Sequence, residues 1–144
     1  MSRQNVLNGE SSEYAAYLRA ERLLQPGLLL LLSLRPMHGY ELIQMLNGVA
    51  FTGEESDPAT VYRNLRRMED DGLVHSQWEA GESGPARRVY HLTVEGEHLL
   101  DMMAANARRR REQLEAFLRL FENIRGGLIT QENIEEVMKG DEVR

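Results

Sequence analysis

The sequence of 144 residues contains no cysteine. This absence excludes disulfide bonds, thiolate metal sites and cysteine nucleophiles, and a reducing cytoplasm is the setting that we expect. A long apolar run is absent too, because the richest one, Leu28–Leu34, is far shorter than the roughly 20 residues needed to span a membrane. The first ten residues are polar and lack the basic and apolar regions of a secretory signal. We therefore expect a cytoplasmic protein that makes no use of a membrane.

Signatures of catalysis are also missing. The sequence has no zinc-protease motif, phosphate-binding loop, nucleotide-binding glycine motif or nucleophile elbow. His91, Glu95 and His98 are close in sequence, but they straddle a predicted junction between a strand and a helix and need not converge on a metal. The sequence thus predicts a protein that is not an enzyme and that carries no cofactor or metal.

The net charge of −6 is unfavourable for binding nucleic acid, because non-specific affinity comes from neutralising phosphates. The segment from Pro26 to Thr93 holds six basic and nine acidic residues and is itself acidic. Any argument for nucleic-acid binding must therefore rest on where the basic residues lie.

Three helices are predicted in the first two thirds of the chain, after a polar lead and an accessory helix that Ser11 or Ser12 would cap. The first begins at Pro26 and is buried around most of its circumference, and the second runs from about Gly39 to Asn47. The third has the clearest start, because Asp57 is a good N-cap and Pro58 suits the first helical position.

Two strand-like segments follow, 73–79 and 87–93, and the seven residues between them contain two glycines and a proline. This pattern predicts a hairpin with a long tip. Trp78, in the first strand, is expected mainly to pack in the core, although at an interface it would be able to line a pocket for an apolar effector.

The segment from Glu95 to Ile124 is predicted to form one helix of about 45 Å, too long to be covered by this small domain. Eight residues recur along it at alternating spacings of three and four, and seven of them are apolar. They are Leu100, Met103, Ala107, Arg110, Leu114, Phe117, Phe121 and Ile124. Such a seam favours a partner helix, and a second copy of the chain is the simplest partner. After Gly126-Gly127 we expect a short helix capped by Thr130.

The order of three helices and a hairpin is that of a winged helix-turn-helix, in which the third helix enters the DNA major groove. We therefore predict a mainly α (α+β) fold, a winged helix-turn-helix with a two-stranded wing and a long C-terminal dimerisation helix. Its expected parts are an N-terminal lead and accessory helix (1–25), the DNA-binding domain (26–94) and the dimerisation region with its short terminal helix (95–144).

The third helix carries three arginines on its outer face. Taking Val61, Leu65 and Met68 as the core-facing stripe, Arg63, Arg66 and Arg67 lie at about 200°, 140° and 240° around the helix from Val61. Arginine can hydrogen-bond guanine or two phosphate oxygens with its planar fork. The predicted DNA-binding residues are Pro58, Ala59, Thr60, Tyr62, Arg63, Arg66, Arg67, Arg87 and Arg88.

A solvated helix face balanced by Glu69 and Asp70 is the alternative explanation of these arginines. Tyr62 is expected to have a mixed role, because its position at the edge of the stripe also allows it to cover the core. The run of arginines from Arg108 to Arg111 wraps around the long helix and is expected to be solvated.

The sequence also carries spaced motifs that resemble those of the PadR-like transcriptional regulators. They are His38-Gly39-Tyr40-Glu41-Leu42, Asp57-Pro58-Ala59-Thr60-Val61-Tyr62-Arg63-Asn64-Leu65, Glu69-Asp70-Asp71-Gly72-Leu73-Val74, Arg88-Val89-Tyr90-His91-Leu92-Thr93 and Glu95-Gly96. The resemblance covers Pro26 to about Leu100. It implies a repressor that binds double-stranded DNA at a palindromic operator as a homodimer.

Within this family, the segment from Ser83 to Tyr90, with Trp78 before it, is similar to polyhydroxybutyrate-responsive repressors. That similarity implies an apolar or polyester-related effector that would release the repressor from its operator. The alternative function, which the acidic balance favours, is a protein-interaction module of the same fold that does not bind DNA.

Overall fold

A computed structural model describes residues 23–49, 51, 56–81 and 83–141 of the chain. The accessory helix predicted near Ser11 lies outside these residues. The described helices and strands are α3 (Leu24–Leu34), β1 (Met37–His38), α4 (Gly39–Gly48), α5 (Pro58–Asp70), β2 (Val74–Glu79), β3 (Arg87–Leu92), α6 (Val94–Arg125) and α7 (Ile134–Asp141). The chain divides into two compact units, 1–101 and 102–144, and α6 continues from one to the other. None of the described helices has the length and apolarity needed to cross a bilayer.

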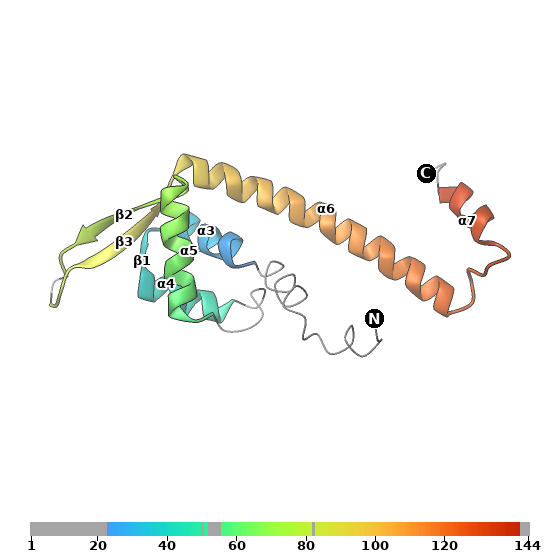
Figure 1. Ribbon diagram of the computed structural model, residues 1–144, viewed down its shortest axis with the longest axis horizontal. Coiled ribbons are helices and arrows are strands. Elements are labelled where there is room, and N and C mark those ends of the chain that lie inside the picture. Colours follow the sequence, from blue (N-terminus) through green and yellow to red (C-terminus); the bar gives the residue numbers. More distant parts are fainter. Residues whose placement is uncertain (1–22, 50, 52–55, 82, 142–144) are drawn as a thin grey trace, which may run out of the picture. The chain divides into compact units, whose positions relative to one another are not determined.

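The core of the first unit lies between α3, α4, α5 and a small sheet (Figure 1). Each helix contributes side chains that are fully or almost fully buried: Leu28, Leu29, Leu42, Leu46, Val61, Leu65 and Met68. Burying one such side chain stabilises a fold by about 1.5–3 kcal/mol. The three residues of the α5 stripe are all fully buried, as the sequence predicts. In α3, five of the eleven residues are buried and lie around more than half of the circumference, while Leu30 and Leu34 on the remaining side are exposed.

The sheet has three antiparallel strands in the order β1-β3-β2. The predicted hairpin of β2 and β3 is confirmed, and it extends away from the helices (Figure 1). The third strand, β1, was not predicted, because two residues after Pro36 are too few to show an alternating pattern. Met37 in β1 pairs with Tyr90 and is 1% exposed, so this short strand attaches the hairpin to the core. The predicted winged helix-turn-helix is otherwise confirmed.

Local capping explains where the helices begin. The Asp57 carboxylate accepts a hydrogen bond of 2.9 Å from the Thr60 amide, which confirms the predicted start of α5. The helix α3 begins at Leu24, two residues before the predicted start, and Pro26 is tolerated in its first turn. The prediction of Thr130 as the cap of α7 is wrong: the Asn133 side chain accepts from the Thr130 amide, and the helix begins at Ile134.

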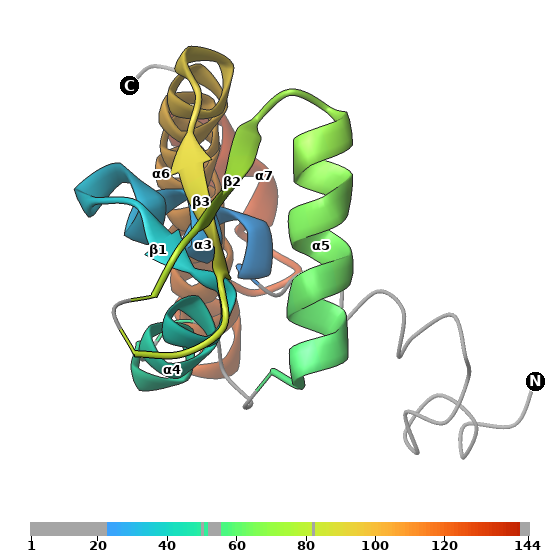
Figure 2. The ribbon, with the colours of Figure 1, turned by 90° about the vertical axis from the view of Figure 1, so that its left-hand side faces the viewer.

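The end of α5 is attached to the wing by a polar cluster. Glu69 accepts hydrogen bonds from the hydroxyl and the amide of Ser76 in β2, at 2.6 and 2.8 Å. Arg88 in β3 donates to the same hydroxyl at 2.7 Å and lies 3.7 Å from the Glu69 carboxylate. The Ser76 hydroxyl, more than any other contact, holds the pKa of Glu69 below its usual value. This Glu69 cluster fixes the hairpin against α5, which lies beside β2 (Figure 2).

The junction between β3 and α6 depends on a glycine. The Thr93 hydroxyl donates to the Gly72 carbonyl and accepts from the Gly96 amide, which caps α6. Gly96 is buried, and a Cβ at this position would lie 2.1 Å from the Leu73 carbonyl oxygen and 2.6 Å from the Leu92 side chain. Because the first of these is a backbone atom, a larger residue forces the junction apart.

We therefore predict that Gly96→Ala lowers the free energy of unfolding by about 3 kcal/mol, the upper part of the usual range for overpacking. Urea denaturation followed by circular dichroism measures this change. Gly48→Ala is the matched control, because a Cβ at Gly48 meets no atom within 4 Å. Equal stability of the two variants would contradict the close approach at the junction.

A second prediction concerns the Glu69 cluster and pH. Because the folded-state pKa of Glu69 lies below its ordinary value of 4.5, its ionised form stabilises the fold above that pH, and this contribution is lost as the pH falls through the folded-state pKa. Glu69→Gln should lower the stability at neutral pH by about 1 kcal/mol, the value of a typical hydrogen bond. The difference from wild type should shrink in acid.

Urea titrations at several pH values measure the effect. The control is Asp70→Asn, which removes the exposed carboxylate next in the chain. A difference between wild type and Glu69→Gln that is the same at every pH would show that the Glu69 charge contributes nothing.

Candidate nucleic-acid interface

The outer face of α5 presents its arginines to solvent. Arg63, Arg66 and Arg67 are exposed, on the side opposite the buried stripe. Pro58 and Ala59, at the start of the helix, are exposed as well. The orientation expected from helical geometry is therefore confirmed, and guanidinium groups are available along a little more than one turn of the helix.

The start of α5 differs from what the sequence indicates for Thr60. Its amide and its hydroxyl both donate to the Asp57 carboxylate, at 2.9 and 2.6 Å. These hydrogen bonds, the hydroxyl first, hold the pKa of Asp57 below its usual value, so the carboxylate stays charged. Both donors of Thr60, one of the predicted DNA-binding residues, are thus already satisfied inside the protein by an anion.

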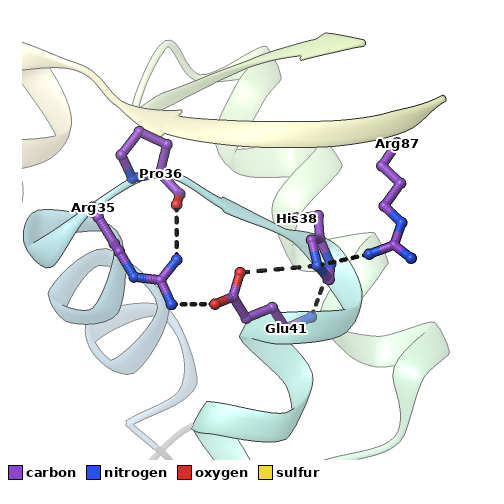
Figure 3. A network of polar contacts seen from close by, with 5 residues as sticks. All are labelled: Arg35, Pro36, His38, Glu41 and Arg87. Atoms are coloured by element: carbon purple, nitrogen blue, oxygen red, sulfur yellow. Dashed lines mark hydrogen bonds and ion pairs between the residues drawn. The ribbon is translucent and has the colours of Figure 1, made fainter. Parts of the chain in front are cut away.

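Arg87 lies at the end of a polar network that begins at α3 (Figure 3). Arg35 forms an ion pair with Glu41, which raises the pKa of Arg35 and lowers that of Glu41. His38 caps α4, because its Nδ1 accepts a hydrogen bond of 3.2 Å from the Glu41 amide. Its Nε2 lies 3.9 Å from the Glu41 carboxylate and 3.3 Å from Nη1 of Arg87.

The role of Nδ1 decides what Arg87 gains from this contact. A neutral imidazole that accepts at Nδ1 carries its proton at Nε2, so Nε2 is a donor. The guanidinium of Arg87 is also a donor only. The two groups therefore face each other without a hydrogen bond between them, and Arg87 keeps its capacity to bind an anion.

Arg88 is in a different position from the other predicted DNA-binding arginines. Besides its contacts in the Glu69 cluster, its guanidinium lies 5.8 Å from the centre of the Trp78 ring. The prediction that Trp78 packs mainly in the core is wrong, because this side chain is 69% exposed at the outer part of the hairpin. The structure thus uses Arg88 to join the wing to α5 and to cover one side of the indole.

A pocket of about 500 Å³ lies between the first turn of α4, the outer face of α5 and the hairpin. We call it the α4–wing pocket; it is lined by His38, Gly39, Tyr40, Tyr62, Arg66, Trp78, Arg87, Arg88 and Tyr90. Tyr62 lies directly against Gly39, where a Cβ would be 2.4 Å from its ring. Burial raises the pKa of Tyr90 and keeps its hydroxyl protonated. Tyr62 thus covers the edge of the core, as its angle on the helix allows, while its expected contact with DNA stays a prediction.

No pattern in the sequence places His38, Tyr40 or Tyr90 in a site. Their motifs carried the family resemblance, but nothing local indicates that segments around residues 38, 62 and 88 converge. The signal available was Tyr40, an aromatic residue one position after the expected start of α4 at Gly39.

The predicted dimerisation residues lie along α6. Leu100 and Met103 are half-buried, Ala107 and Arg110 are exposed, and Leu114, Phe117, Phe121 and Ile124 leave about half of their surface in water. The rings of Phe117 and Phe121 are 6.4 Å apart. The guanidinium of Arg125 lies 5.7 Å from the centre of the Phe121 ring. The far part of α6 therefore presents an apolar surface that stays about half exposed among the described residues.

Comparison with known proteins agrees with this architecture. The family model described as "Transcriptional regulator PadR-like family" matches residues 28–102. A crystal structure from Thermoplasma acidophilum, described as that of a transcriptional regulator, is 30% identical, with a TM-score of 0.58; the match covers 67% of this chain and 91% of that one. A search of curated protein sequences found no significant match.

Two further solved structures carry the family name. A PadR-like transcriptional regulator from Bacillus cereus is 27% identical, with a TM-score of 0.58, and the match covers 67% of this chain and 91% of that one. A PadR family transcriptional regulator from Eggerthella lenta is 28% identical, with a TM-score of 0.58 and coverage of 78% and 96%. With the family model matching more than half of its length, the chain belongs to the PadR-like family of transcriptional regulators.

Proposed function

We propose that this chain is a cytoplasmic, homodimeric repressor whose two α5 helices enter successive major grooves of a palindromic operator. The observation that carries this proposal is the row of exposed arginines on α5, opposite a stripe that is fully buried. The family membership supports DNA binding and regulation of transcription. Neither the family nor the site indicates catalysis.

Within the interface, the contacts of each arginine support different roles. Arg63 and Arg67 are exposed and lie outside the α4–wing pocket, so we assign them to base edges and neighbouring phosphates. Arg87, which gains no hydrogen bond from His38, is assigned to the phosphate backbone beside the wing. Arg88 positions the wing through Glu69, and its contribution to DNA contact is indirect.

The exposed apolar seam of α6 supports the homodimer. Four large side chains repeat on it at spacings of three and four, from Leu114 to Ile124, which is the pattern of a helix that packs against another helix. A two-fold partner would bring two copies of α5 to the same side of DNA about 34 Å apart, one helical turn. We propose that the same dimer seam also includes Leu100, Met103, Ala107 and Arg110.

Release by an effector is part of the same proposal. A ligand that binds the operator-free dimer more tightly would change the separation of the two α5 helices and so weaken operator binding. The polyester-responsive subtype gains no support from the relatives described above, because none of their descriptions names an effector. An apolar effector is therefore proposed without a subtype.

A protein-interaction module without DNA binding is the second candidate. It is favoured by the acidity of the segment from Pro26 to Thr93, which holds three more acidic than basic residues. Such a module would have no specific affinity for DNA. Replacement of a single outward arginine would therefore leave its DNA binding unchanged.

The assigned reading face is tested by Arg63→Ala. Loss of a bidentate contact to guanine should weaken operator binding about ten- to a hundredfold and relax specificity at one base pair of each half-site. Fluorescence anisotropy with labelled operator DNA measures the affinity. Arg119→Ala, which removes an exposed arginine of α6 outside both predicted sets, is the charge-matched control. The same affinity in the two variants would remove Arg63 from the interface.

The α6 seam is tested by Phe117→Glu combined with Phe121→Glu. Wild-type protein should have about 33 kDa in solution, twice the chain mass of 16.5 kDa, and the double variant should have the mass of one chain. Sedimentation equilibrium measures both. Glu115→Gln combined with Arg119→Gln changes the polar side of the same helix and should leave the dimer intact. A dimeric double variant would place the interface elsewhere.

A further inference from the structure

The α4–wing pocket has the size of a small-molecule site. Its volume of about 500 Å³ lies within the range of about 300–1,000 Å³ that is typical of ligand pockets. All three of its walls belong to the first unit, and the α5 wall contributes Tyr62 and Arg66.

One side of this pocket is built for an anion. Among the described residues, no carboxylate lies within 4.0 Å of the guanidinium groups of Arg66 and Arg87, whereas Arg88 lies 3.7 Å from Glu69. The nearest acidic residue across the hairpin is Glu79, the strand partner of Arg87, and it forms no ion pair with Arg87. Two guanidinium forks without a close carboxylate match a phosphate group in shape and charge better than a singly charged carboxylate.

The other side is built for a flat ring. The side chains of Tyr40 and Trp78 are 63% and 69% exposed, and that of Tyr62 is 36% exposed. Three aromatic rings in one pocket present faces on which a nucleic-acid base stacks, with a gain of about 1–3 kcal/mol per base. Arg88 already covers one part of the Trp78 ring, so a second face of the indole would take the ligand.

We propose that the α4–wing pocket binds a nucleoside monophosphate, with the phosphate on Arg66 and Arg87 and the base against Tyr40 and Trp78. Duplex DNA alone does not fill the aromatic side of this pocket, because the faces of its bases are already stacked on one another. Since Arg66, Arg87 and Tyr62 also belong to the predicted DNA interface, the nucleotide and the operator exclude each other. Such a ligand would release DNA by direct competition, without a change in the separation of the two α5 helices.

The chain reports on this binding by itself, because Trp78 is its only tryptophan. Titration of the full chain with adenosine or guanosine monophosphate, in the absence of DNA, should change the tryptophan fluorescence and saturate in the micromolar range, near or below about 100 μM. Inorganic phosphate alone and adenosine alone should each bind at least about tenfold more weakly, because each fills one side only. A single-stranded oligonucleotide is a further arm of the experiment.

Substitutions test the anion side and the aromatic side of the pocket separately. Arg87→Gln and Tyr40→Ala should each weaken nucleotide binding about tenfold or more, and Tyr40→Phe should restore it, because the ring is kept. Arg63→Gln lies on the same helix as Arg66 but outside the pocket; it should keep nucleotide binding while losing DNA affinity. Isothermal calorimetry on the same variants provides a readout that does not depend on Trp78.

Three results would overturn the proposal: no saturable signal up to millimolar nucleotide, equal affinity for inorganic phosphate and nucleotide, or binding of the oligonucleotide without binding of the mononucleotide. The last would identify an unpaired strand as the occupant. Because these titrations contain no duplex DNA, their failure is distinct from failure of the repressor proposal, which the operator titrations test.

Discussion

The burial of one stripe of α5 is the constraint on which the rest of this structure depends. Val61, Leu65 and Met68 are completely removed from water against the core, and rotation of the helix by even a quarter turn would expose them. At about 1.5–3 kcal/mol for each buried side chain, this is a large share of the stability of a small domain. The rotation of α5 is therefore fixed by apolar contacts, and the outward direction of its arginines follows without any contribution from the arginines themselves.

Polar contacts then set what surrounds that helix. Asp57 satisfies the amides at its start, and Glu69 attaches its end to Ser76 and Arg88 of the wing. His38 uses its Nδ1 to cap α4, and this leaves Arg87 beside a donor rather than an acceptor. In an acidic chain, these pairings neutralise some charges and leave others available, so the cationic surface is a local property that the net charge of −6 conceals.

What the sequence predicts here is local, and what it misses is tertiary. The start of α5 and the two strands of the hairpin depend on neighbours within a few residues, so Asp57-Pro58 and the pattern of the strands were sufficient. The strand β1 exists only because Met37 pairs with Tyr90, which is far along the chain. Trp78 was expected inside because it is apolar, whereas it lies on the hairpin at the rim of the α4–wing pocket and is 69% exposed. The α4–wing pocket escaped prediction since its walls come from three separate segments.

The central claim is that a chain with an acidic balance uses a locally cationic face to bind a specific DNA sequence. The most direct measurement is fluorescence anisotropy with DNA from upstream of its own gene, beside scrambled DNA of the same length, over a range of salt concentrations. The account predicts a preference for the upstream DNA and a loss of about a thousandfold in affinity between about 50 and 200 mM salt, as expected for six or more phosphate contacts in a dimer. Equal, weak binding of both DNAs at every salt concentration would contradict it and favour a module that binds protein partners.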